Sequence, residues 1–534
     1  MRDQVIQITP RGSSGQQYAY RHSPEKIWLP LVAKNTLLAI FFVILLCIGA
    51  FYSTNIPNSY VFNSVSSFTP MKSVFSATTV DDNKMPFAPK NTVEFPLNCS
   101  VVDENMKTCP ANYYPSKFVP NNTSTKSKGT CPEYFRYIHE DLLPWRKTGI
   151  TEDMVSMASK TANFRLVILN GKAYVETYEK AFQTRDTFTL WGILQLLRKY
   201  PGQIPDLDLM FDCVDWPVIK KEDYDCPKPN SSNPIPGPPP LFRYCADDVT
   251  YDIVFPDWSF WGWAEINIKP WEHLSKDLKE GNKRINWTDR EPYAYWKGNP
   301  NVAETRMDLL KCNVSDTQDW HAMIYVQDWV KEHEEGYKKS DLAKQCNHRY
   351  KIYIEGSAWS VSEKYILACD SVPLIVNPNY YDFFSRGLIP LQHYWPINVD
   401  DKCRSIKHAV DWGNSNTEQA QVIANAASSF ILEELKMDYV YDYMFHLLNE
   451  YAKLLKYKPR IPPNATELCS EAMACPAQGF EKKFMTDSTV KGPSSEAPCV
   501  MPPPYDPATF RSIIDRKESS IKQVENWKTQ DWES

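Results

Sequence analysis

One aspartate stands where a general base would be needed. Asp215 directly follows a predicted strand at 207–214 and precedes Trp216 and Pro217. Proline lacks a backbone N–H and pushes the residue before it into extended geometry, so the strand is expected to end there. A carboxylate at the carboxyl end of a strand can take a proton from a bound hydroxyl. Asp215 is the candidate base; an ordinary turn cap at a strand end is the alternative.

A second region has the chemistry of a phosphate site. The segment 346–376 reads as a strand, a tight loop at Gly356, a short helix and a second strand. The S-x-x-E sequence from Ser360 to Glu363 predicts a capping box at the start of that helix. In a βαβ unit the helix N-terminus faces the carboxyl edge of the sheet, where phosphorylated ligands bind. Lys364 adds a cation there, and an ordinary capped helix is the alternative.

A second strand-to-helix turn repeats this arrangement earlier in the chain. A short strand at 293–296 leads into a turn that contains Gly298, and a helix is expected to begin near residue 301. Arg306 falls in the first turns of this helix. Two helix N-termini, each with a nearby cation, are therefore predicted at one edge of a sheet.

Other carboxylates in this part of the chain fit chemistry less well. Asp206 and Asp208 form a loose D-x-D pattern, which suits Mg²⁺ or Mn²⁺, but they lie at the start of the 207–214 strand, away from the ligand edge. We therefore predict no metal site. Asp212 lies inside the strand and is interpreted as structural or as a support for Asp215. A glycoside hydrolase needs two carboxylates flanking one bond, and Asp212 and Asp215 cannot easily face one site.

An aromatic block at 255–263 could contact a sugar. An aromatic ring is flat and apolar and can stack on the C–H face of a pyranose, although such clusters also build cores and interfaces. The candidate platform residues are Trp258, Phe260 and Trp261.

The elements that must position these residues lie between about residues 130 and 455, where helical and strand patterns alternate. This length is enough for two α/β domains, which we place at 129–285 and 286–457. Residues 458–534 are rich in proline, contain three cysteines and end in a charged stretch that could be helical; we interpret them as a tail.

The N-terminal part of the chain predicts a membrane anchor. Residues 36–52 carry no charge, and the residues before them are more basic than those after them. We predict a cytosolic tail at 1–34, a transmembrane signal anchor at 35–53 and a stem at 54–128. The rest of the chain would then lie in the lumen, as a type II membrane protein. A chain end without a retrieval signal favours the Golgi membrane over the endoplasmic reticulum.

Glycosylation signals and cysteines agree with a lumenal body. All sequons lie beyond the anchor, at Asn98, Asn121, Asn122, Asn230, Asn286, Asn313 and Asn464. Thirteen of the 14 cysteines also lie beyond it, so at least one is free or pairs between chains. Cys346 precedes a strand and Cys369 ends the following helix, so both fall at the non-ligand edge of the βαβ unit. We predict that these two form a disulfide.

The charge of the chain argues against nucleic acid as a partner. The formal net charge is −6, and basic residues are scattered.

Five motifs in order along residues 130–455 identify a resemblance: Cys131 to Trp145 (CPEYF…EDLLPW), Asp212 to Pro217 (DCVDWP), Pro256 to Trp261 (PDWSFW), Trp296 to Gly298 (WKG), and Gly356 to Ser371. The chain resembles the Rumi-like protein O-glucosyltransferases and the capsule-associated xylosyltransferases, which form one glycosyltransferase family.

The resemblance implies a GT-B fold, in which two Rossmann-like domains face each other across a cleft. It implies inverting transfer from a UDP-sugar without a metal or other cofactor, with Asp215 as the base on the acceptor side. The C-terminal domain would hold the nucleotide sugar, and the implied donor-binding residues are Gly298, Arg306, Gly356, Ser360 and Lys364. Glucose and xylose are the favoured sugars; they differ by one CH₂OH group, which a pocket separates only modestly.

Two departures from the family leave alternatives open. Animal members carry an arginine where this chain has Ser362, which puts the family's phosphate contacts in doubt here. Those members are also soluble, so their acceptor is not transferred, and a glycoprotein or a polysaccharide acceptor is expected. A non-catalytic glycan-binding scaffold that keeps the fold is the alternative function.

Overall fold

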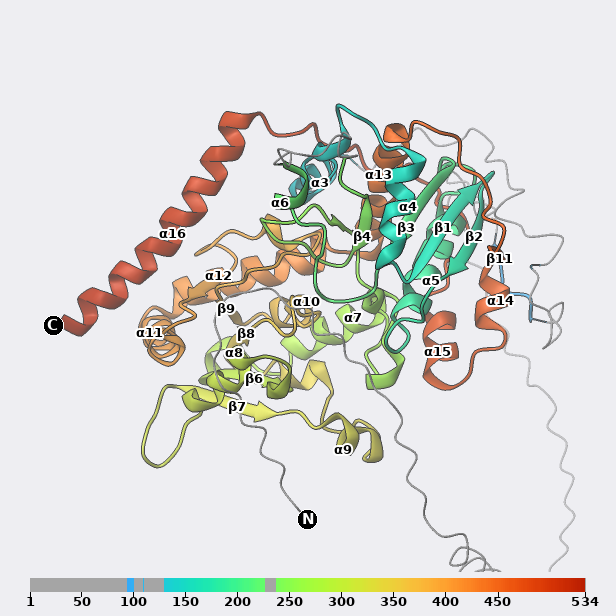
Figure 1. The fold of residues 1–534 in the computed structure, drawn as a ribbon. Helices are drawn as coiled ribbons and strands as arrows, with labels where there is room; N and C mark the ends of the chain where they lie inside the picture. Colours follow the sequence, from blue (N-terminus) through green and yellow to red (C-terminus); the bar gives the residue numbers. More distant parts are fainter. Residues whose placement is uncertain (1–93, 100–108, 110–128, 226–236, 534) are drawn as a thin grey trace, which may run out of the picture. The chain divides into compact units, whose positions relative to one another are not determined.

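The computed structural model describes residues 94–99, 109, 129–225 and 237–533, with the backbone alone for the last six of these (Figure 1). The predicted cytosolic tail, the signal anchor and most of the stem lie outside the described residues. Within the described ranges, no helix is both long enough and apolar enough to cross a bilayer.

The first sheet has six strands in the order β11-β2-β1-β3-β4-β5. They are β1 (Phe164–Leu169), β2 (Lys172–Thr177), β3 (Leu207–Phe211), β4 (Leu241–Arg243), β5 (Ile253–Val254) and β11 (Thr466–Leu468). β3, β4 and β5 are parallel, but β1 runs antiparallel to both β2 and β3. The sheet is therefore mixed, whereas the Rossmann-like domain that was expected has a parallel sheet. We call this sheet, with the helices packed on it, the first lobe.

The second sheet has five strands, all parallel, in the order β10-β9-β8-β6-β7. They are β6 (Glu291–Gly298), β7 (Ala322–Val326), β8 (His348–Tyr353), β9 (Val372–Val376) and β10 (Trp395–Ile397). The central strand β8 and its neighbour β9 are almost fully buried, as expected for a parallel sheet covered on both faces. We call this sheet and its helices the second lobe.

The helices follow the same division. The first lobe has α3 (Tyr137–Asp141), α4 (Glu152–Met157), α5 (Arg185–Lys199), α6 (Glu222–Asp225), α13 (Met437–Leu454), α14 (Ser470–Ala474) and α15 (Gly479–Asp487). The second has α8 (Glu304–Leu309), α9 (Trp329–Glu334), α10 (Glu363–Leu367), α11 (Lys402–Ser415) and α12 (Thr417–Ser429). α7 (Trp271–Asn282) packs on both the 258–260 segment and the 342–345 segment. A turn of π-helix at Phe430–Glu434 joins α12, which packs on β9, to α13, which packs on β3 and α5. The chain thus returns to the first lobe.

The predicted tail is part of the folded body. β11 adds an edge strand to the first sheet, pairing antiparallel with β2. The last helix, α16 (Pro507–Glu533), begins beside the first lobe, where the rings of Phe510 and Tyr137 lie 6.1 Å apart. It ends beside the second lobe, where Trp527 lies 6.1 Å from Trp395 (Figure 1). Residues 458–534 therefore contact both lobes and are not an independent appendage.

Disulfides join distant parts of the described chain. Cys346 and Cys369 are bonded, which is the pairing that the sequence predicts. Four further disulfides are Cys99–Cys475, Cys109–Cys469, Cys131–Cys499 and Cys312–Cys403. Three of them tie the beginning of the described chain to its last 70 or so residues, which explains why residues 458–534 are held in place. Among the described cysteines, Cys213 and Cys245 are free and buried.

The described sequons differ in their surroundings. Asn98, Asn286 and Asn464 are exposed, whereas Asn313 is half-buried and its side-chain carbonyl accepts a hydrogen bond from the Ile324 N–H at 2.8 Å. Asn121, Asn122 and Asn230 lie outside the described residues.

Candidate active site

The carboxyl ends of the parallel strands of the two lobes meet. The segment after β4 pairs with the segment after β9 through an antiparallel bridge between Ala246 and Tyr381. The buried Cys245 lies next to this bridge; its thiol donates a hydrogen bond to the Asp215 carbonyl at 3.0 Å and contacts the Trp359 backbone of the second lobe. The loop after β3 and the loop after β8 therefore lie close to each other.

Asp215 lies in a bend four residues beyond the end of β3, because β3 ends at Phe211 and not at residue 214 as the sequence predicts. Its carboxylate oxygen Oδ1 accepts a hydrogen bond from Nη1 of Arg185, the first residue of α5, at 2.6 Å. The described residues offer no hydrogen bond to the second oxygen, Oδ2, and the side chain is partly exposed. A carboxylate with one bound oxygen and one open oxygen can accept a proton from an incoming hydroxyl.

Asp212 stabilises the backbone segment that carries Asp215. It pairs with Arg243 in a fully buried contact, and its Oδ1 accepts the Val214 N–H at 2.9 Å. Arg243 in turn donates to the Val214 carbonyl at 3.0 Å and lies 2.9 Å from Asp252. Burial raises the pKa of Asp212, and the Arg243 guanidinium opposes that rise. Asp212 therefore has the structural, supporting position that the sequence analysis assigned to it.

Arg306 and Gly356 come together at the carboxyl edge of the second sheet. The Arg306 guanidinium donates to the backbone carbonyls of Ile354 and Glu355, at 3.0 and 2.8 Å. A Cβ on Gly356 would lie 3.3 Å from Arg306 Nη2, so the glycine lets the guanidinium approach the backbone closely. Burial lowers the pKa of Arg306. Gly298 ends β6 near this edge, but a Cβ there would meet the Trp296 ring, so its first role is to accommodate that indole.

The predicted capping box at Ser360 does not form. α10 begins at Glu363, its N-cap is Ser362, and no side chain caps it. The Ser360 hydroxyl instead lies 2.9 Å from the Ser362 hydroxyl. Glu363 does not reach back, because its carboxyl is buried and its pKa is raised by burial and then by its neighbours Asp382 and Glu355.

Lys364 is not open to a ligand. Its ammonium, on α10, lies 2.9 Å from Asp257 Oδ2 and 2.8 Å from the Ser259 hydroxyl, both in the segment after β5. Burial alone would lower the pKa of Lys364, but Asp257, Tyr365 and Asp382 together outweigh burial, and the pKa is raised. The cation that was predicted to stabilise a phosphate forms a sealed ion pair between the lobes.

The aromatic block is core and not a sugar platform. Trp258, Phe260 and Trp261 are 1%, 0% and 0% exposed. Trp258 packs against Tyr244 at 4.9 Å and under the Arg185 guanidinium at 4.5 Å. The block is buried because α5, α7 and α13 cover it, which a local sequence pattern cannot reveal.

Exposed aromatic residues lie elsewhere around Asp215. Trp216, the next residue, is 50% exposed, and its ring meets that of Tyr380 edge to face at 5.8 Å. Glu355 holds Tyr380 in place by accepting its backbone N–H at 2.8 Å. Phe182 is 68% exposed, and its ring centre lies 5.5 Å from the Arg185 guanidinium. Sequence reasoning missed these residues; the only available signal was that Trp216 lies inside the Asp212–Pro217 motif.

The two carboxylates of the D-x-D pattern, Asp206 and Asp208, both accept hydrogen bonds from other parts of the first lobe. Asp208 is fully buried, and both its oxygens pair with Arg165 at 2.8 and 2.6 Å. Asp206 accepts the Asn170 N–H at 2.7 Å. Both carboxylates are therefore engaged in contacts within the protein.

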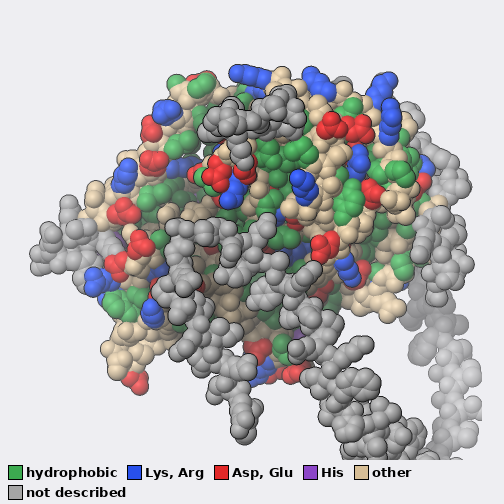
Figure 2. All heavy atoms as spheres, in the orientation of Figure 1, with side chains coloured by type: hydrophobic (Ala, Val, Ile, Leu, Met, Phe, Trp, Pro, Cys, Tyr) green, Lys and Arg blue, Asp and Glu red, His purple; other side chains and the backbone are tan. Residues whose placement is uncertain are grey.

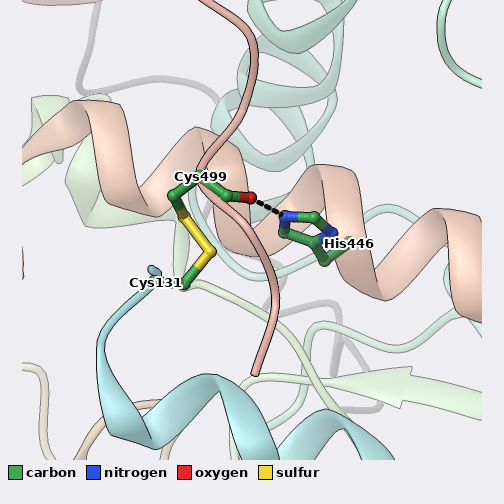
Figure 3. Close-up of side chains that lie close together, drawn as sticks. All are labelled: Cys131, His446 and Cys499. Atoms are coloured by element: carbon green, nitrogen blue, oxygen red, sulfur yellow. Dashed lines mark hydrogen bonds between the residues drawn. A yellow bond between two sulfur atoms is a disulfide. The ribbon is translucent and has the colours of Figure 1, made fainter. Parts of the chain in front are cut away.

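A cluster of Cys131, His446 and Cys499 has the residue types of a metal site, but its two cysteines form a disulfide (Figure 3). His446 Nε2 lies 2.7 Å from the Cys499 carbonyl, and burial lowers its pKa. Bonded sulfurs do not provide the thiolates that zinc prefers, so this group is structural.

Acidic and basic side chains are interspersed on the face drawn in Figure 2, and its described residues form no broad basic patch there. This distribution is unlike the basic stripe of a nucleic-acid-binding surface.

Comparison with known proteins decides the family. A family profile described as glycosyl transferase family 90 matches residues 126–528. The chain belongs to glycosyl transferase family 90. It is therefore a glycosyltransferase. The match extends well beyond residue 455, where the resemblance was expected to end, through most of the region predicted as a tail.

Relatives in family 90 cover much of the chain at modest identity. Protein O-glucosyltransferase 1 of Bos taurus is 26% identical over 347 residues, which is 62% of this chain and 82% of the relative. The O-glucosyltransferase rumi of Drosophila melanogaster is 23% identical over 363 residues, 65% of this chain and 82% of the relative. Protein O-glucosyltransferase 2 of Danio rerio is 25% identical over 344 residues, 62% of this chain and 64% of the relative.

Proposed function

We propose that this glycosyltransferase moves glucose or xylose from a UDP-sugar to a hydroxyl group with inversion at the anomeric carbon, and that Asp215 is the general base. The observation that carries the proposal is the half-engaged carboxylate of Asp215, placed where the carboxyl ends of both sheets meet. This facing arrangement is what a GT-B fold requires, although β1 departs from a Rossmann-like sheet.

The chemistry follows from one open oxygen. The acceptor oxygen forms a bond to the anomeric carbon while the bond from that carbon to the UDP oxygen breaks. The acceptor proton passes to Oδ2 of Asp215, and UDP leaves with the bonding electron pair. Inversion results because attack and departure occur on opposite faces of the sugar.

The proposed donor contacts lie at the carboxyl edge of the second sheet. Arg306, Gly356 and Gly298 are there, with the Ser360 hydroxyl in the following loop. A buried guanidinium close to a diphosphate would stabilise its developing charge. Lys364 is left out of the proposed contacts because Asp257 already holds its ammonium.

We propose that no metal ion takes part. The support is the engagement of Asp208 by Arg165 and of Asp206 by a backbone N–H, which removes the D-x-D pattern as a ligand pair.

The acceptor is proposed to be a glycoprotein, because the relatives are named protein O-glucosyltransferases, with a polysaccharide as the alternative. We also propose a type II anchor at 35–53 and a Golgi location, on the charge asymmetry, the exposed sequons and the disulfides.

A binding and turnover experiment tests this function. Thermal stability of the full-length protein is measured with UDP, UDP-glucose, UDP-xylose, UDP-galactose and GDP, each with and without EDTA, and UDP release is measured in parallel. We expect UDP and one UDP-sugar to stabilise the protein regardless of EDTA. Asp215→Asn should lower turnover by about 10²- to 10⁴-fold while UDP still binds.

Near-normal turnover by Asp215→Asn would remove Asp215 from its role. An EDTA-sensitive shift would show that a metal takes part, and glycan binding without any nucleotide effect would favour a scaffold.

A further inference from the structure

Arg185 is the side chain that fixes the orientation of the candidate base. We propose that Arg185 is a positioning residue, which holds Oδ1 of Asp215 so that Oδ2 points to the acceptor hydroxyl. This inference rests on the proposed function of Asp215. Arg185 contacts neither substrate nor the reacting atoms in this proposal and acts through Asp215 alone.

The geometry of the contact is specific to one oxygen. Arg185 Nη1 lies 2.6 Å from Asp215 Oδ1 and also donates to the Cys213 carbonyl at 3.1 Å. The same nitrogen thus joins the backbone just after β3 to the carboxylate two residues later. A base that is free to rotate spends only part of its time in the productive orientation, and a donor on one oxygen removes that freedom.

Two aromatic rings contact the Arg185 guanidinium. The buried Trp258 ring lies 4.5 Å from the centre of the guanidinium, and the exposed Phe182 ring lies 5.5 Å from it. The loop that carries Phe182 is tied down as well: Trp263 Nε1 donates to Gln183 at 2.8 Å, and Thr184 donates to Glu265 at 2.9 Å. The aromatic block of the sequence therefore acts beneath the candidate base, as a support for its arginine.

A second arginine–aspartate pair in the same lobe shows how a purely structural pair differs. Arg165 holds both oxygens of Asp208, at 2.8 and 2.6 Å, and Tyr457 donates to Asp208 at 2.9 Å. No oxygen of that carboxylate is left for chemistry. At Asp215 the arginine occupies one oxygen only, which is the arrangement that a general base needs.

The experiment compares Arg185→Gln and Arg185→Lys with the wild type in steady-state UDP release from UDP-glucose and UDP-xylose, with water as the acceptor. Active sites are counted by UDP binding, so loss of folded protein does not enter the rate. We expect Arg185→Gln to lower kcat by about 10- to 100-fold with the donor KM changed by less than about 2-fold. Arg185→Lys keeps a cation and should recover about 5-fold or more of that loss.

Arg165→Gln is the matched control, because it breaks the structural pair. It should lower stability and leave kcat per UDP-binding site unchanged. The inference is overturned if Arg185→Gln has wild-type kcat, if it changes only the donor KM, or if Arg165→Gln lowers kcat equally. Failure of the wild type to bind UDP or to release it from any UDP-sugar would instead overturn the proposed function, and this inference with it.

Discussion

Two carboxylates near the junction of the lobes are each paired with a cation, and their surroundings are opposite. The Arg185–Asp215 pair is 11% and 21% exposed and leaves one carboxylate oxygen open. The Lys364–Asp257 pair is 1% and 4% exposed, and its ammonium also bonds Ser259. The first pair joins parts of one lobe at an open edge, and the second crosses from one lobe to the other inside a continuous core.

The difference shows that a charged residue near a predicted site serves chemistry only if part of its bonding capacity stays open. A sealed pair has lost its hydration and depends on its partner, so removing one member is costly. An open pair retains access to water and to ligands, so its loss should affect turnover more than folding.

The largest expected loss of stability follows removal of the sealed cation. Lys364→Ala leaves the Asp257 carboxylate buried without a counter-charge and should lower the free energy of unfolding by about 3–5 kcal/mol in urea denaturation. The control Lys279→Ala breaks an exposed pair with Glu433 and should cost at most about 1 kcal/mol. Equal effects of the two substitutions would contradict the sealed interpretation.

Removal of the Trp258 side chain should cost about as much stability as removal of the Lys364 side chain. Trp258→Ala leaves a cavity beneath Arg185 and beside Tyr244, and should lower the free energy of unfolding by about 3–5 kcal/mol, measured in the same way. A loss under about 1 kcal/mol would mean that this tryptophan is less tightly packed than its burial indicates.

The sealed region should also respond to pH through Asp382. Burial raises the pKa of Asp382 to about 6, while the N–H groups of Ser385 and Phe384 and the Lys364 cation lower it and Asp257 raises it. An unfolded aspartate has a pKa of about 3.9, so the folded chain binds more protons than the unfolded chain between about pH 4 and 6. This contribution to stability is present below about pH 4 and is lost as the pH rises through about 6.

Asp382→Asn should remove this dependence and keep an oxygen for both N–H groups. The difference in unfolding free energy between wild type and variant should change by about 1–3 kcal/mol between pH 4 and pH 6.5. A difference that is constant across this range would show that Asp382 does not titrate there.

The smallest effect on stability is expected at the open edge. Trp216→Ala removes a half-exposed side chain and should change the free energy of unfolding by no more than about 0.5 kcal/mol. A loss comparable to that of Trp258→Ala would mean that the contact between Trp216 and Tyr380 holds the two lobes together.

Local patterns predicted the elements of this fold well. The strand predicted at 293–296 lies within β6, and the segment 346–376 contains the predicted strand, short helix and second strand as β8, α10 and β9. Strand direction was not accessible, because alternation of apolar residues is the same in parallel and antiparallel strands; hence β1 was missed as an antiparallel neighbour of β3. The tail was missed because its disulfides join positions more than 350 residues apart.

The features of the candidate site also fall into those that the sequence predicted and those that depend on the tertiary structure. By itself the sequence determined that Gly356 follows β8 and that Cys346 pairs with Cys369, because glycine and a short βαβ unit act over a few residues. It predicted the strand before Asp215 but extended it to residue 214, whereas β3 ends at Phe211. Only the tertiary structure decided which charges stay open and which aromatic rings are exposed. Lys364 meets Asp257 across 107 residues, and Arg185 meets Asp215 across 30, and neither partner can be read from the neighbours of the other. Burial and ion pairing depend on segments that come together only when the chain folds.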